Sequence, residues 1–164
     1  MNKNGNIKLT IPKYPRLIID TLQKAGYDAY IVGGCVRDQL LNVTPDDFDI
    51  TTNAKPDEIK KLFNKTIDTG IKHGTVSVLF YDKGNPITFE VTTYRIDCEY
   101  DDARHPKNVV FVKDLREDLK RRDFTVNAMA YNDKLGLVDE FDGLDDLHHK
   151  IIRAVGVPYE RFSE

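Results

Sequence analysis

Residues 27–41, YDAYIVGGCVRDQLL, run from a strand pattern through a glycine turn into a helix pattern. Tyr27–Val32 is aromatic and β-branched, as strands are, and it leads directly into Gly33 and Gly34. The apolar spacing that follows predicts a short helix over Cys35–Leu41. The sequence therefore predicts a strand, a turn and a helix in immediate succession, with no side chains at the turn.

This side-chain-free turn has the form of an anion-binding junction. Backbone N–H groups at a helix N-terminus can approach a phosphate closely where glycines precede the helix, and Arg37 would add a charged guanidinium. Gly33, Gly34 and Arg37 are therefore candidate phosphate-binding residues. The alternative is a purely structural turn in which Arg37 pairs with a neighbouring carboxylate such as Asp38.

Two aspartates follow in residues 47–51, DFDIT, where polar and apolar side chains alternate as in a half-buried strand. Such a strand would turn Asp47 and Asp49 to one face and Phe48 into the core. Hard cations such as Mg²⁺ prefer carboxylate oxygens together with substrate phosphates, and a pair of them can activate a hydroxyl and neutralise a leaving pyrophosphate. The alternative is an ordinary acidic turn, since Asp46 precedes the pair.

A third carboxylate, Glu90, lies inside a predicted strand. The patterns over Thr75–Tyr81 and Ile87–Tyr94 flank the turn residues 82–85 and predict an antiparallel hairpin. Alternation places Glu90 on the polar face of the second strand. It would complete a metal-binding triad with the two aspartates, or it could simply face solvent on an open sheet.

The fourth motif combines two arginines with an acid and an amide. Arg121 and Arg122 offer guanidinium groups for phosphate, and Asp123 with Asn127 could bind ribose hydroxyls. The alternative is a helix start at which Asp123 favours the helix dipole.

The remaining patterns mix helices and strands. We expect a mobile loop over residues 96–106, alternation over Leu137–Phe141 and a short helix after it. Mixed elements without regular βαβ alternation favour an α+β domain. The helices predicted elsewhere are Tyr14–Ala25, Pro56–Asn64, Leu115–Lys120 and Phe124–Tyr131.

Composition limits the possible classes of protein. A chain of 164 residues suits one domain, and the net charge of -3 argues against a surface that binds nucleic acid over its whole extent. Cys35 and Cys98 have no paired spacing, which favours free thiols and a reducing compartment. No apolar run approaches the roughly 20 residues that span a bilayer. We expect a cytoplasmic protein.

The motifs stand in a fixed order: VGGCVRD at 32–38, DFDITT at 47–52, EVTTYR at 90–95 and RRDFTVNA at 121–128. This set resembles the head domain of the bacterial class II tRNA nucleotidyltransferase and poly(A) polymerase family. The resemblance implies a polymerase-β-like nucleotidyltransferase fold, with a mixed or antiparallel sheet flanked by helices. It also implies Mg²⁺-dependent attack of an RNA 3′-hydroxyl on the α-phosphate of CTP or ATP, with release of pyrophosphate and no template.

The resemblance assigns roles motif by motif. Asp47 and Asp49 match the metal carboxylates of the family, and Glu90 matches its third acidic position, so these three are the predicted catalytic residues. Mg²⁺ is the expected cofactor, and CTP, ATP and a tRNA 3′ end are the expected partners, with no membrane involved. The predicted nucleotide-binding residues are Gly33, Gly34, Arg37, Arg122, Asp123 and Asn127.

Residues 1–150 are expected to form the head domain, and residues 151–164 to begin a neck segment that is cut short. In the family, the neck selects the base, and further domains supply most of the grip on tRNA. Residues 94–106 resemble the flexible loop of CCA-adding and A-adding members. The alternatives are an A-adding enzyme, a poly(A) polymerase head and a nucleotide- or RNA-binding module without turnover. A metal-dependent glycosyltransferase fits the glycine turn and the arginine motif poorly.

Overall fold

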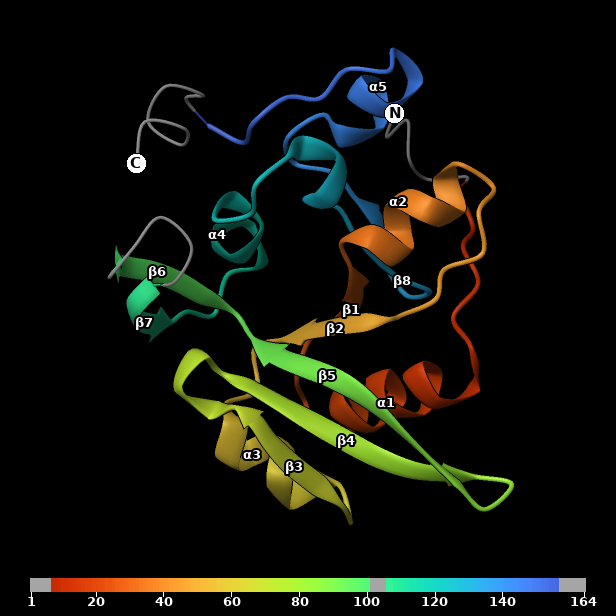
Figure 1. Ribbon diagram of the computed structural model, residues 1–164, viewed down its shortest axis with the longest axis vertical. Helices are drawn as coiled ribbons and strands as arrows, with labels where there is room; N and C mark the ends of the chain where they lie inside the picture. Colours follow the sequence, from red (N-terminus) through yellow and green to blue (C-terminus); the bar gives the residue numbers. More distant parts are fainter. Residues whose placement is uncertain (1–6, 101–105, 157–164) are drawn as a thin grey trace.

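The computed structural model describes residues 7–100 and 106–156. A mixed sheet of seven strands forms the centre of this part, in the spatial order β3-β4-β5-β2-β1-β8-β9 (Figure 1). The predicted α+β class is confirmed. The strands are β1 (Ala29–Val32), β2 (Asp49–Thr52), β3 (Thr66–Gly70), β4 (Thr75–Asp82), β5 (Asn85–Thr93), β8 (Ala130–Asn132) and β9 (Gly136–Val138).

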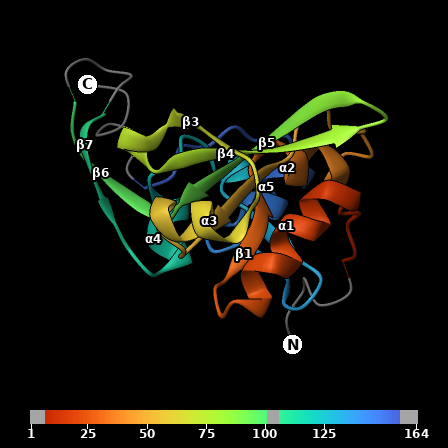
Figure 2. The same ribbon diagram turned by 90° about the horizontal axis from the view of Figure 1, so that it is seen from below.

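Short helices flank the sheet. The helices α1 and α3 contact each other and pack against β1, β2 and β4, and Figure 2 shows both at the front when the molecule is seen from below. The helices α2 and α5 contact the 3₁₀ turn η2. The bounds are α1 (Lys13–Lys24), α2 (Gly34–Leu40), α3 (Pro56–Leu62), α4 (Leu115–Lys120) and α5 (Gly143–His148), with η1 (Ile71–His73) and η2 (Thr125–Asn127).

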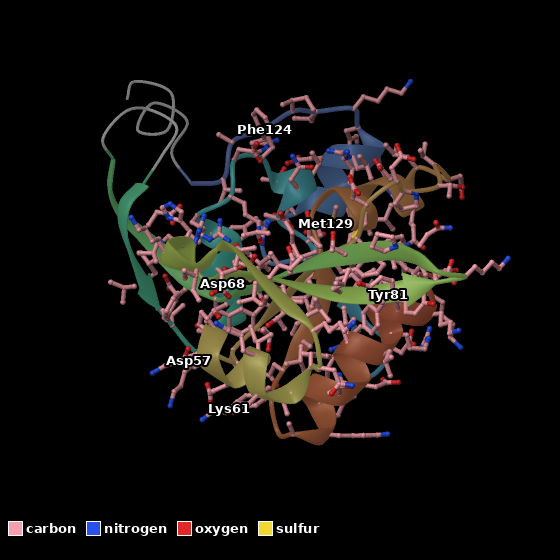
Figure 3. The ribbon with its side chains drawn as sticks, turned by 60° about the horizontal axis from the view of Figure 1, so that its bottom comes forward. Asp57, Lys61, Asp68, Tyr81, Phe124 and Met129 are labelled. Atoms are coloured by element: carbon pink, nitrogen blue, oxygen red, sulfur yellow. The ribbon has the colours of Figure 1, made fainter. Side chains whose placement is uncertain are left out.

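The core explains why the predicted elements form. The strand β1 lies inside the sheet, between β2 and β8, and all four of its residues are buried. Each buried aliphatic side chain contributes about 1.5–3 kcal/mol. Figure 3 places Met129 inside the molecule, whereas Asp57 and Lys61 lie on the outer side of α3. The main core includes Ile18, Leu22, Ile31, Ile50, Ile59, Val76, Val91 and Met129, and a second cluster includes Tyr30, Val32, Tyr94, Leu119 and Ala130.

The predicted hairpin is confirmed. The strands β4 and β5 pair antiparallel from Thr75 opposite Thr92 to Asp82 opposite Asn85. The two residues between them, Lys83 and Gly84, both have positive φ, as the favoured two-residue hairpin turn requires. This long ribbon carries Glu90 at a fixed register.

The prediction of a mobile loop over 96–106 is wrong where the structure describes it. The strands β6 (Arg95–Tyr100) and β7 (Pro106–Phe111) pair antiparallel as a separate ribbon, drawn beside α4 in Figure 1. The acid-rich composition suggested a loop, but pairing with a strand later in the chain supplies the missing backbone hydrogen bonds. Residues 101–105, within the segment that resembles the family loop, lie outside the described residues.

The helix predicted over Phe124–Tyr131 is also wrong. The segment forms η2 and then enters β8. Tyr131 of β8 lies opposite Ile31 of β1. All three residues of β8 are buried. Pairing with the central strand therefore outweighs the helical spacing of the local sequence.

Within the described ranges, no helix is long and apolar enough to cross a membrane.

The start of the predicted neck segment packs on the sheet domain. Ala154 forms a β-bridge with Phe124, and both Ala154 and Val155 are buried. Residues 157–164 lie outside the described residues, and the domain boundary at 150 stays a prediction.

Candidate active site

Three predicted carboxylates line one pocket near the start of β2, one of the inner strands of the sheet. Asp47, Asp49 and Glu90 border a pocket of about 400 Å³. Asp49 and Glu90 lie side by side, because β2 and β5 run parallel with Ile50 opposite Val91. The pocket is completed by Asp46, Phe48, Ile87, Thr88 and Phe89.

The glycine turn lies at the same end of these inner strands. Val32, the last residue of β1, is opposite Asp49 in the antiparallel pair with β2. Gly33 follows at once, and its N–H donates to the carbonyl of Met129 at 3.1 Å, just beyond η2. Sheet register therefore gathers motifs that are far apart in the sequence.

The prediction that Asp47 shares a strand with Asp49 is wrong. The strand β2 begins at Asp49, and Asp47 lies in the irregular segment before it. On one side β1 ends at Val32, after which Gly33 turns the chain away, and on the other side the parallel pairing with β5 begins at Ile50. Phe48 packs against the main core, as predicted.

Asp49 has a carboxyl pKa above its usual range. The residue as a whole stays exposed, but protein partly surrounds the carboxylate; this partial desolvation is the main cause, and the negative charge of Glu90 adds to it. The guanidinium of Arg122 opposes the shift, and Asp47 adds a smaller increase. An ionised Asp49 is therefore electrostatically unfavourable in the protein alone, and an added cation would stabilise it.

Arg122 brings the fourth motif beside the glycine turn. Its side chain is 20% exposed, and Nη1 lies 3.7 Å from the place that a Cβ at Gly33 would occupy. Gly33 has a φ of 81° as the N-cap of α2, a conformation that strongly favours glycine. The turn thus satisfies a backbone requirement and lies directly against the guanidinium.

Arg37 contacts its sequence neighbour and the arginine motif. Its Nε and Nη2 donate to Asp38 Oδ1 at 3.2 and 3.0 Å, so the structural pairing considered from the sequence is present. Its Nη1 also donates to Asn127 Oδ1 at 2.7 Å. Asn127 Nδ2 in turn donates to Asp123 Oδ1 at 3.3 Å. These side chains form one polar row from α2 to η2.

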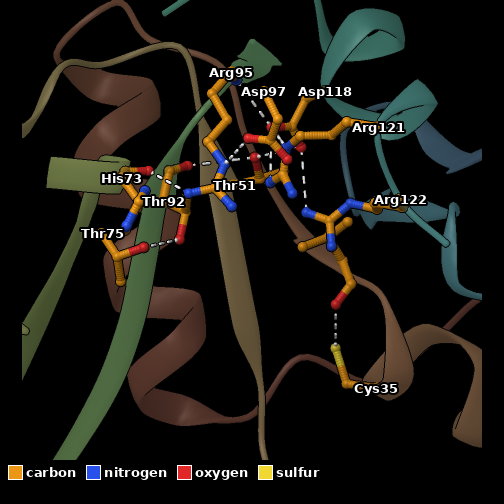
Figure 4. Close-up of polar contacts among 11 residues, drawn as sticks. Cys35, Thr51, His73, Thr75, Thr92, Arg95, Asp97, Asp118, Arg121 and Arg122 are labelled. Atoms are coloured by element: carbon orange, nitrogen blue, oxygen red, sulfur yellow. Dashed lines mark hydrogen bonds and ion pairs between the residues drawn. The ribbon is translucent and has the colours of Figure 1, made fainter. Parts of the chain in front are cut away.

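A set of buried charges beside the site was not predicted. Asp118 is fully buried and forms ion pairs with Arg121 and Arg122, each at 3.2 Å. Arg95 lies next to them and donates from Nη1 to the carbonyl of His73 at 2.7 Å (Figure 4). One signal was available in the sequence, because Asp118 precedes the arginines by three and four residues, the spacing of helical neighbours.

The donor set fits a hard cation, with one qualification from the geometry. Asp47, Asp49 and Glu90 supply only carboxylate oxygens, the ligands that Mg²⁺ prefers. Across residues 7–100 and 106–156, however, no three His, Cys, Asp or Glu side chains are close enough to hold a metal ion by themselves. Mg²⁺ is commonly bound by one or two carboxylates together with substrate phosphates, so the pocket fits an ion that arrives with a nucleotide.

Residues 29–153 match the family described as the poly(A) polymerase head domain. The chain belongs to this family. Within it, the chain is 53% identical over 149 residues to the CCA-adding enzyme of Pediococcus pentosaceus, which covers 91% of the chain and 37% of the relative. It is 54% identical over 147 residues to that of Lactiplantibacillus plantarum, covering 90% of the chain and 35% of the relative. This head domain therefore spans about a third of the length of these relatives.

Solved structures agree on the fold of the head domain. The crystal structure of the Bacillus stearothermophilus CCA-adding enzyme with CTP matches with a TM-score of 0.77 and 46% identity, over 89% of this chain and 34% of that one. The Thermotoga maritima CCA-adding enzyme complexed with tRNA matches with a TM-score of 0.63 and 28% identity, over 90% and 34%. The predicted nucleotidyltransferase fold is confirmed.

Proposed function

We propose that this chain is the catalytic head of a template-independent nucleotidyltransferase that adds CMP and AMP to the 3′ ends of tRNA. The observation that carries the proposal is the sheet register. It brings Gly33, Asp49 and Glu90 close together on the inner strands of the sheet. Arg122 Nη1 lies 3.7 Å from the position of a Gly33 Cβ. Carboxylates and a phosphate-binding cation thus border the same space.

On the carboxylate side, Asp47 and Asp49 would hold Mg²⁺, with Glu90 as the third acidic group. When bound, the ion would supply charge neutralisation for the leaving pyrophosphate and activation of the attacking 3′-hydroxyl. The negative charges of Glu90 and Asp47, which add to desolvation in raising the pKa of Asp49, support this assignment because a cation would neutralise them.

On the cationic side, the glycine turn, Arg37 and Arg122 would bind the triphosphate. Guanidinium groups form strong, paired hydrogen bonds with phosphate oxygens. Asp123 and Asn127 would bind the ribose, since both carry oxygen acceptors within the polar row that Arg37 begins. The chain's own residues thereby orient the α-phosphate toward the carboxylate pocket.

The names of the relatives support CCA addition, and the description of the matching family keeps a poly(A) polymerase head as the second candidate. Because the chain covers about a third of those relatives, the base choice and the grip on tRNA are proposed for the longer enzymes rather than for this segment. We therefore expect the chain to bind CTP and ATP with little preference between them.

Calorimetric titration of the chain with CTP and with ATP tests the proposal, in Mg²⁺ and again in EDTA. We expect binding of both nucleotides that is lost in EDTA. The matched control is Asp20→Ala, which removes an exposed carboxylate from α1 and should leave both affinities unchanged. Binding that persists in EDTA would favour a nucleotide-binding module without metal chemistry.

A further inference from the structure

Asp118, on α4, is a buried carboxylate that receives hydrogen bonds from several elements. Its exposed fraction is 0%, and the proposed function gives it no contact with a substrate. Oδ1 accepts from the backbone N–H of Arg95 at 3.1 Å and from Arg121 Nε and Nη2 at 3.3 and 3.2 Å. Oδ2 accepts from Thr51 Oγ1 at 3.3 Å and from Arg122 Nη2 at 3.2 Å. Figure 4 shows these groups converging.

The Oδ2 contacts place Asp118 immediately behind the site. Thr51 is two residues after Asp49 on β2, so the two side chains share one face of the strand. Arg122 therefore extends from the same oxygen that Thr51 binds, toward the glycine turn and Asp49. Asp118 thus links β2, which carries the proposed metal ligand Asp49, to the proposed phosphate-binding side chain of Arg122.

Arg122 has few other contacts that fix its orientation. Within the described residues, its Nε is buried without a hydrogen-bond partner, and its guanidinium donates a hydrogen bond only to Asp118. Desolvation lowers the pKa of the guanidinium, and Asp118 is the largest opposing influence. A buried guanidinium without its counter-ion is strongly disfavoured, so removal of the Asp118 charge would move Arg122 away from Gly33 toward solvent.

We propose that Asp118 is a positioning residue that fixes the Arg122 guanidinium beside the glycine turn and thereby sets the affinity for the nucleotide triphosphate. The inference rests on the proposed function for the identity of the ligand. It adds that the phosphate-binding cation is held in place by a carboxylate that never touches the nucleotide. The Arg95 contact anchors the first residue of β6 to the same carboxylate.

A double-mutant cycle tests this coupling. In Asp118→Asn, the charge is lost while the shape is kept, and we expect MgATP binding to weaken roughly tenfold, as the loss of a charge-assisted interaction implies. In Arg122→Met, binding should weaken at least as much. The double variant should be no weaker than Arg122→Met alone, because Asp118 acts through Arg122. Additive losses would overturn the inference.

The control separates positioning from stability. Ile59→Val trims a buried side chain of α3, which packs against β4 and does not line the carboxylate pocket, and it should lower the unfolding temperature without changing MgATP affinity. All titrations are made well below the unfolding temperature of each variant. If Asp118→Asn does not fold, Thr51→Val removes one donor to Asp118 at nearly constant volume. Binding by Thr51→Val that equals the wild type would then overturn the inference.

A readout without nucleotide distinguishes this inference from the proposed function. The Nε–H of Arg122 is buried, so its NMR signal should exchange slowly with solvent in the wild type and rapidly in Asp118→Asn. Slow exchange in both would overturn the positioning role even if MgATP binds. Loss of slow exchange in a chain that binds neither MgATP nor MgCTP would support the positioning role and refute the proposed function.

Discussion

The two sides of the candidate site are built in opposite ways. On the cationic side, the protein supplies the counter-charges itself, since Asp118 pairs with Arg122 and Asp38 pairs with Arg37. On the anionic side, Asp47, Asp49 and Glu90 are exposed, and none makes a side-chain hydrogen bond or ion pair within the described residues. The arginines are thus fixed in advance, whereas the carboxylates have no bonded counter-charge. The protein therefore preorganises one half of the site and leaves the other half to be completed by a ligand.

Removal of the uncompensated carboxylates should have the largest effect. The double variant Asp47→Ala/Asp49→Ala should lose Mg²⁺-dependent nucleotide binding, and the same change in a full-length enzyme should lower CMP addition to tRNA by about a thousandfold or more, because the metal would lose its protein ligands. Since both residues are exposed, the unfolding temperature should stay close to that of the wild type. Retained Mg²⁺-dependent binding in a folded double variant would sink the assignment of the metal side.

On the preorganised side, loss of Arg122 should reduce stability as well as binding. In Arg122→Met, Asp118 keeps its burial but loses one of its two arginine partners. Breaking a buried ion pair costs about 3–5 kcal/mol, and the remaining Arg121 contact should place this variant at the low end. Chemical denaturation measures the free energy of unfolding. A change below about 1 kcal/mol would mean that the pair is not part of the fold's stability.

At the junction between the two sides, the two glycines should respond differently. Gly33→Ala forces a Cβ into a backbone with a φ of 81° and should cost about 1–3 kcal/mol of stability. Gly34 has no positive φ, and a Cβ there would meet Arg37 Nη2 at 3.4 Å, an ordinary contact. Gly34→Ala should therefore leave stability nearly unchanged. Equal losses in thermal unfolding would contradict the role given to the Gly33 conformation.

The smallest effect should come from neutralising Asp49. Because its pKa is raised in the folded protein, folding favours the protonated form, and the ionised form costs stability above the folded-state pKa. Asp49→Asn should therefore raise the unfolding temperature slightly at neutral pH without metal. The gain should disappear as the pH falls below the pKa of an unfolded aspartate, where both states are protonated. Thermal unfolding from pH 3 to 8 measures this, and a gain that grows toward low pH would reverse the expected sign.

Local sequence patterns predicted the parts of the site that depend on neighbouring residues. Alternation placed Glu90 on the polar face of β5, and the hairpin turn at 82–85 followed from turn chemistry. The glycine pair marked the strand-to-helix junction because its backbone requirement is local. These predictions are confirmed, since each depends on interactions within a few residues.

Patterns failed where a distant partner decides the conformation. The segment Phe124–Tyr131 has helical spacing, yet Ala130–Asn132 becomes a strand because β1 offers it a buried place in the sheet. The ribbon of β6 and β7 replaces an expected loop for the same reason. Asp47 lies outside β2, whose pairing with β1 starts only at Asp49, and this starting point is not contained in the alternation pattern.

Residue types in a fixed order were enough to indicate the family, the α+β class and the charged residues of the motifs. Which charges from distant segments meet depends on the fold. Asp118 belongs to none of the four sequence motifs, yet in the fold it is buried beside Thr51 and is the counter-ion of Arg122. The physical reason is that a charge acquires its energetic role from the solvent it loses and the partners it gains, and both are set by distant parts of the chain.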